Sequence, residues 1–151
     1  MKSLNLKPSN GSHQWCGPTA AAIALEVDYD IAYKKCLRAR RKRTPHLKIR
    51  YIKGMSDGDL ASVVRQRWST FRFKYPIRKV GRLRHRLHTL NSLMDHLRPN
   101  RLYIVSVTGH YLTVNTQDWT VMDNWHDVPI PVAQSEHRLC RVRAYGLVRK
   151  L

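Results

Sequence analysis

Residues 14–25 read Gln-Trp-Cys-Gly-Pro-Thr-Ala-Ala-Ala-Ile-Ala-Leu, a stretch that sets a cysteine where a loop turns into a helix. Gly17 and Pro18 suit the first positions of a helix, and the alanines that follow are strong helix formers. A helix from about Gly17 to Leu25 would be apolar all round, which indicates burial among the other elements. Cys16 would then stand at the helix N-terminus, where unpaired backbone N–H groups and the helix dipole favour a thiolate. The sequence therefore predicts a central helix that presents a nucleophilic sulfur.

A cysteine nucleophile also needs a base and a group that orients the base, and both occur late in the chain. His110 and Asp123 each lie at the edge of an apolar, strand-like run. In this set Cys16 is the candidate nucleophile, His110 the base, and Asp123 the residue that orients the imidazole. Asn124 is the alternative orienting residue. Because neighbours at a strand end point in different directions, only one of the two can face His110.

These residues together resemble the papain-like cysteine peptidase superfamily, nearest its small bacterial and phage C39-like branch. The resemblance lies in the Cys16-Gly17-Pro18-Thr19-Ala20 helix start, in Gly109-His110 before a late strand, and in Asp123 or Asn124 after the next strand. It implies a papain-like α+β fold, in which N-terminal helices, with the cysteine helix at their centre, pack on a C-terminal antiparallel sheet. Asp123 is preferred because C39-like relatives use aspartate and because a carboxylate stabilises an imidazolium more strongly than an amide does.

The oxyanion hole departs from the family pattern. Many members carry a glutamine about six residues before the nucleophile as a donor to the oxyanion, but Asn10 occupies this position here and the nearby glutamine is Gln14. Asn10 can donate in the same way if its shorter side chain reaches, and the backbone N–H of Cys16 would be the second donor. His13, three residues before Cys16, is a rival base. A lead-in loop would hold it less rigidly than a strand would hold His110.

Length and composition predict one domain over residues 1–151. The chain has 151 residues, of which 42% are hydrophobic, enough to bury a core without disulfides or a metal. Residues 1–8 lack the apolar core of a signal peptide, and no run approaches the roughly 18 apolar residues of a membrane span. The odd set of cysteines, without metal-like spacing, fits reduced thiols. We therefore expect a cytoplasmic protein with no membrane partner, no metal and no cofactor.

The second strong signal is charge, with 28 Lys and Arg against 10 Asp and Glu and a formal net charge of +18. Such an excess is usually tolerated because something anionic is bound, and nucleic acid is the first candidate. A basic insertion around residues 38–53 is expected to form an exposed loop or arm, because Pro45 stops any helix there. A second cluster lies within residues 78–88. The candidate anion-binding residues are Arg38, Arg40, Arg41, Lys42, Arg43, Arg82, Arg84 and Arg86.

The remaining patterns complete an α+β domain. Helices are expected from Asp28 to about Arg38, from a capping box at Ser56 and Asp59, and from Thr89 to about Arg98. Alternating aromatic and basic residues predict a short strand at 71–75. The β-rich segments of the last third are residues 102–108, 111–115, 119–122 and 139–148.

The resemblance and the residues together favour a cysteine hydrolase that acts on a protein or peptide through a thioester intermediate. A peptidase, an isopeptidase and a deamidase share this chemistry. Two alternatives stay open. One is a nucleic-acid-binding protein on a papain-like scaffold, whose basic surface contacts nucleic acid or another polyanion. The other is a transglutaminase-type acyltransferase, in which an amine rather than water resolves the thioester.

Overall fold

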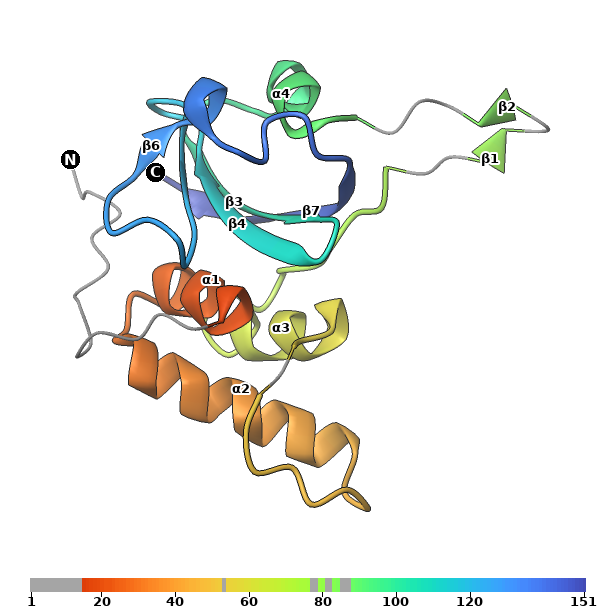
Figure 1. Ribbon diagram of the computed structural model, residues 1–151, viewed down its shortest axis with the longest axis vertical. Helices are drawn as coiled ribbons and strands as arrows, with labels where there is room; N and C mark the ends of the chain where they lie inside the picture. Colours follow the sequence, from red (N-terminus) through yellow and green to blue (C-terminus); the bar gives the residue numbers. More distant parts are fainter. Residues whose placement is uncertain (1–14, 53, 77–78, 81–82, 85–87) are drawn as a thin grey trace.

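A computed structural model describes residues 15–52, 54–76, 79–80, 83–84 and 88–151 (Figure 1). Helices come first and a five-stranded antiparallel sheet follows, which confirms the predicted α+β class. The helices are α1 (Cys16–Leu25), α2 (Tyr29–Arg43), α3 (Asp57–Val64) and α4 (Leu90–Leu93), with short 3-10 turns η1 (Met94–His96) and η2 (Val132–Gln134). The strands are β1 (Lys79–Val80), β2 (Leu83–Arg84), β3 (Arg101–Val107), β4 (His110–Asn115), β5 (Thr120–Met122), β6 (Ile130–Pro131) and β7 (Val142–Lys150).

The five-stranded sheet has the order β6-β5-β4-β3-β7 with antiparallel neighbours, and β1 pairs with β2 in a separate hairpin. Strands β3 and β4 form a tight hairpin in which Val107 lies opposite His110. Gly109 in the connecting turn has φ 73°, in the left-handed region that glycine enters without steric cost. The turn therefore fixes His110 as the first residue of β4, at one end of the sheet.

Both faces of the sheet are buried along its central strands, β3 and β4, whereas the edge strand β7 exposes alternate residues. One face packs on the layer of α1, α2 and α3, which lies below the sheet in Figure 1, through Leu102, Ile104, Tyr111, Met122 and Val148. The other face packs on α4 and η2 through Tyr103, Val105, Val107, Leu112, Val114, Val121 and Val142. Successive residues of β3 divide between the two cores, because side chains of a strand point to alternate faces. The result is a sheet between two unequal layers.

Helix α1 lies where the sequence predicts and is as buried as its composition indicates. Every residue from Gly17 to Leu25 is buried, and the helix contacts α2, α3 and β4. It ends at Glu26, which has φ 57° and caps the last turn through its backbone N–H. The indole Nε1 of Trp68 donates a 2.7 Å hydrogen bond to the carbonyl of Ala24. These contacts fix the direction in which α1 carries Cys16.

Helix α2 is longer than the sequence predicts, since it continues past Arg38 to Arg43. The physical reason lies in its last turn, where four basic residues face the negative end of the helix dipole. Thr44 closes the helix by donating its hydroxyl to the carbonyl of Arg40 at 2.9 Å. The first part of the expected basic arm is therefore helical, and residues 44–52, the rest of the described part of the insertion, are irregular.

Three other expectations are corrected. Residues 71–75 form no strand beyond a single bridge from Lys74 to Tyr145, because the N–H of Phe71 donates to the carbonyl of Trp68 in a turn instead of to a neighbouring strand. Ser56 caps α3 by accepting from the Asp59 N–H at 3.2 Å, but the Asp59 carboxylate pairs with Arg43, so no capping box forms. Thr89 does form a capping box, with Ser92, yet the helix it opens ends early in a 3-10 turn.

Among the described residues, no helix combines the length and the apolar character needed to cross a membrane.

Candidate functional site

A cleft of about 600 Å³ opens between the N-terminus of α1, the start of β4 and the loop that precedes α3. Cys16 and His110 both line it, although they lie almost a hundred residues apart in the sequence. Trp15 and Trp125 form part of its walls, and Asp57 and Arg143 supply charge to the lining. The structure therefore brings the candidate nucleophile and the candidate base to one cavity.

Cys16 is the first residue of α1, and Trp15 is the N-cap. The first N–H groups of a helix have no acceptor within the helix, so they leave positive partial charge beside the sulfur. Burial raises the pKa of the Cys16 thiol, but the hydrogen bond with His110, the backbone N–H of Tyr111 and the charge of His110 lower it more. The net pKa lies below the ordinary value of 9.0, which favours the thiolate.

His110 makes a hydrogen bond with Asp123 and lies near enough to Cys16 for each of the two to shift the pKa of the other. Its Nε2 donates to Oδ2 of Asp123 across 2.9 Å, which leaves Nδ1 for a second partner. Burial lowers the pKa of His110, but the hydrogen bonds with Asp123 and Cys16 outweigh it and raise the pKa to about 9. A raised imidazole pKa beside a lowered thiol pKa favours the thiolate and imidazolium pair.

Asp123 follows β5, the strand next to β4, and this placement brings its carboxylate to His110. Its second oxygen, Oδ1, accepts from the backbone N–H of Trp125 and faces Nδ1 of His126, each at 2.9 Å. Burial raises the pKa of Asp123, but the hydrogen bonds from His110, His126 and Trp125 lower it to about 2. The carboxylate is therefore charged and fixed in orientation.

Asn124, the alternative orienting residue, lines the cleft instead of contacting His110. Its Oδ1 is buried and has no hydrogen-bond partner among the described residues. Because Asp123 and Asn124 are adjacent, the chain direction that turns Asp123 toward His110 turns Asn124 toward the cleft. Of the two candidate orienting residues, Asp123 is the one whose side chain makes a hydrogen bond with His110.

Sequence reasoning missed two histidines beside Asp123. His126 lies three residues after Asp123, a spacing that could have drawn attention to it. His137 lies in the irregular segment before β7, and its ring is stacked on that of His110 with centroids 4.5 Å apart. Trp125 completes this cluster, at 4.7 Å from His110 and 4.8 Å from His137. Nothing in the local sequence around His137 predicts this contact, because it depends on the path of the chain between β6 and β7.

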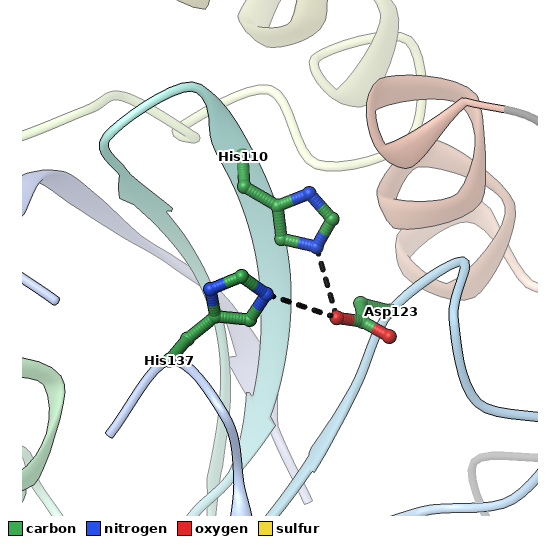
Figure 2. Close-up of side chains that lie close together, drawn as sticks. All are labelled: His110, Asp123 and His137. Atoms are coloured by element: carbon green, nitrogen blue, oxygen red, sulfur yellow. Dashed lines mark hydrogen bonds and ion pairs between the residues drawn. The ribbon is translucent and has the colours of Figure 1, made fainter. Parts of the chain in front are cut away.

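His137 also approaches the carboxylate, as Figure 2 shows. Its Nε2 lies 3.6 Å from Oδ2 of Asp123, the same oxygen that His110 contacts. Burial lowers the pKa of His137, and the charge of His110 lowers it further. His137 is therefore the neutral member of the pair of stacked imidazoles.

The predicted oxyanion donors Asn10 and Gln14, and the rival base His13, lie outside the described residues. Arg82 and Arg86 lie outside them as well, and Arg84 belongs to β2, where only the backbone is described. The backbone N–H of Cys16 is the one predicted donor in the described part of the chain.

The arginines at the end of α2 mostly make contacts within the protein. Arg40 donates to the carbonyl of Gly54, and Arg41 donates to that of Ile49 at 2.8 Å. Arg43 makes two hydrogen bonds to Asp59, of 2.7 and 3.0 Å. These three arginines hold the segment after α2 and the start of α3 in place. Arg38, Arg41, Lys42 and Arg43 are all exposed, so Arg41 and Arg43 make these contacts at the surface.

Comparisons of the chain with known proteins found no matching protein family, no matching curated protein and no matching solved structure.

Proposed function

We propose that this protein is a papain-like cysteine hydrolase, in which Cys16 attacks an acyl carbon, His110 transfers protons and Asp123 orients His110. The observation that supports this most directly is the position of His110, which interacts with the Cys16 sulfur on one side and with Asp123 on the other. The pKa of Cys16 is lowered and the pKa of His110 is raised. A thiolate nucleophile and the acid that protonates its leaving group require these two directions. The cleft gives a substrate access to both.

The proposed reaction has two stages. The Cys16 thiolate forms a bond to the carbonyl carbon, and the carbonyl electron pair moves to oxygen, where the backbone N–H of Cys16 stabilises it. The C–N bond breaks as the electron pair returns, and His110 gives its proton to the leaving amine. Neutral His110 then takes a proton from water, which attacks the thioester carbon. The tetrahedral intermediate that water forms then breaks down with cleavage of the C–S bond. This step releases the carboxylic acid product and restores the Cys16 thiolate and the His110 imidazolium.

Peptidase, isopeptidase and deamidase activities share these steps and differ in which amide enters the cleft. An amine in place of water gives the acyltransferase alternative. Trp15 and Trp125 offer apolar surface beside the reacting atoms, and the exposed Arg143 adds positive charge to the lining. This combination suits an extended peptide segment better than a small polar molecule, since apolar area and a few polar groups together position such a ligand.

The nucleic-acid alternative has weaker support in the described part of the chain. Three of its candidate residues, Arg40, Arg41 and Arg43, serve internal contacts. Exposed Arg38 and Lys42 are on α2, which lies on the side of α1 and α3 that faces away from the sheet (Figure 1). We therefore assign the basic surface an accessory role, in attracting an acidic or nucleic-acid-bound substrate to the enzyme.

The proposal is tested with a mixed library of synthetic peptides and mass spectrometry of the products. Wild-type protein is expected to generate new peptide termini, and Cys16→Ala is expected to abolish them because the nucleophile is lost. Cys36→Ala is the matched control, since Cys36 is buried in the core and burial raises its pKa to about 12. Added methylamine separates the alternatives, because an acyltransferase incorporates it into the product. Cleavage that persists in Cys16→Ala contradicts the proposal.

A further inference from the structure

We propose that His110, Asp123 and His137 form a binding site for a divalent transition metal ion, with Zn²⁺ the best-fitting candidate. The donor atoms are Nε2 of each histidine and Oδ2 of Asp123. All three residues are buried, and their ligand atoms lie within 4.8 Å of one another. Figure 2 shows that both Nε2 atoms are directed at the carboxylate. The site lies on the side of His110 opposite the nitrogen that serves Cys16.

Two of the three distances between donor atoms lie near that of a tetrahedral ion. Bonds of 2.0–2.1 Å in tetrahedral geometry place neighbouring donor atoms about 3.3 Å apart. Oδ2 of Asp123 lies 2.9 Å from Nε2 of His110 and 3.6 Å from Nε2 of His137. The third distance, between the two Nε2 atoms, is within 4.8 Å, and the two rings are stacked, so the His137 ring would tilt toward the ion on binding. Two imidazoles and one carboxylate leave a fourth position for water.

His137 supplies a second and independent reason. Its side chain is only 10% exposed, and its Nε2 is buried without a hydrogen-bond partner among the described residues. A buried polar atom left unsatisfied is costly, and such an atom calls for a physical explanation. A metal ion at this position would coordinate Nε2 and remove the cost.

Each proposed ligand also has a partner on its other polar atom. Oδ1 of Asp123 accepts from Trp125 and faces His126, which leaves Oδ2 available as a single ligand atom. Nδ1 of His137 lies 3.8 Å from the sulfur of Cys140. Such outer contacts orient ligands and fix which imidazole nitrogen faces the ion.

Metal binding would oppose the proposed hydrolysis. An ion on Nε2 of His110 displaces the proton that this nitrogen shares with Asp123, so His110 cannot remain the imidazolium partner of the thiolate. Binding would release that proton to solvent. If the protein is the proposed hydrolase, a bound ion would reversibly inhibit Cys16. The affinity for the ion can be measured whether or not the protein has hydrolase activity.

The test is metal binding by chelator-treated, gel-filtered protein, measured by calorimetry with Zn²⁺ and by visible absorption with Co²⁺. One ion per chain is expected, with cobalt bands of a four-coordinate site and no sulfur-to-cobalt charge-transfer band. His137→Gln should lower Zn²⁺ affinity by more than about 100-fold, because loss of an outer partner alone costs 10–100-fold. His46→Gln, at an exposed position, is the matched control and should bind as wild type does.

Further variants locate the ion. His137→Phe keeps an aromatic ring against His110 and Trp125 but removes the ligand nitrogen. It should lose Zn²⁺ affinity as His137→Gln does, and the same loss in both variants shows that the missing nitrogen, not altered packing, is the cause. Cys16→Ser should retain affinity, whether or not the protein is a hydrolase. Unchanged Zn²⁺ affinity in both His137 variants overturns the proposal. So does loss of affinity in Cys16→Ser, which would place the ion on the thiol, or in His96→Gln, which would place it on the His88 and His96 pair.

Discussion

Asp123 is the residue through which the candidate site is held together. One carboxylate oxygen contacts His110 and the other contacts His126 and the Trp125 backbone, so neither the aspartate nor the imidazole can rotate freely. The negative charge also raises the pKa of His110, in addition to orienting the ring. Asp123 thus acts on His110 in two ways, by orienting the ring and by its negative charge. A substitution of Asp123 can separate the two effects.

Asp123→Asn keeps the size of the side chain and removes its charge. The pKa of His110 should fall from about 9 toward its ordinary 6.5, so that the imidazole is largely neutral at neutral pH and the thiolate loses its partner. Turnover should decrease by about 10²–10⁴-fold, the range that a positioned base contributes. The measurement is the rate of peptide cleavage at neutral pH. Asp127→Asn, at an exposed position, is the control, and an equal loss in both variants would contradict the assigned role of Asp123.

At the residue scale, local sequence predicts only part of the site. The helix start predicts where Cys16 stands, because glycine, proline and alanine have strong positional preferences. Local sequence does not predict the contacts of His137, since these depend on an irregular segment that returns to β4 only in the folded chain. Asp123 and Asn124 could not be separated either, because their directions depend on how β5 ends.

Strand β7 packs closely on the segment after α3 at Gly146. A Cβ at this position would lie 2.6 Å from the Phe71 ring and 2.9 Å from the carbonyl of Arg72. Phe71 is buried in the core that joins α1, α2 and α3 to the sheet. Gly146 therefore lets the segment after α3 lie flat on β7, and this contact helps to fix the sheet relative to the cysteine helix.

Gly146→Ala should destabilise the protein, because the added methyl group meets a buried ring and a backbone carbonyl. We expect a loss of about 1–3 kcal/mol in unfolding free energy, the cost of overpacking a core. Thermal unfolding followed by circular dichroism measures it, at roughly 2–4 °C per kcal/mol for a chain of this size. Gly58→Ala is the matched control, since the nearest atom to its added Cβ is 3.9 Å away and alanine favours a helix. A Gly146→Ala variant as stable as Gly58→Ala would contradict the close approach.

At the element scale, apolar runs with β-rich composition predict strands well, and β3, β4, β5 and β7 fall within a few residues of their expected limits. Prediction fails where tertiary contacts decide the outcome. Helix α2 continues past Arg38 with four basic residues in its last turn, and Arg43 there also pairs with Asp59 on α3, a contact that local propensity cannot reveal. Residues 71–75 alternate like a strand but serve to bury Phe71.

For the whole molecule, the arrangement of layers creates the candidate site. Helix α1 lies beneath the sheet, and its N-terminus meets the end where the hairpin of β3 and β4 turns. Hydrophobic periodicity predicts a helix and a sheet. It does not predict that the N-terminus of the helix lies at the end of the sheet where β3 turns into β4. The order of the motifs along the chain, through its resemblance to papain-like peptidases, predicts that meeting.

The pH dependence of iodoacetamide labelling at each cysteine, read by mass spectrometry, tests directly whether Cys16 is a thiolate stabilised by His110. A thiolate stabilised by His110 predicts that Cys16 reacts faster than Cys36 and Cys140 at neutral pH, with a rate that rises at pH values below the ordinary thiol pKa of 9.0. His110→Ala should move that rise to higher pH. A profile for Cys16 that rises at about 9.0 and is unchanged in His110→Ala would contradict the account.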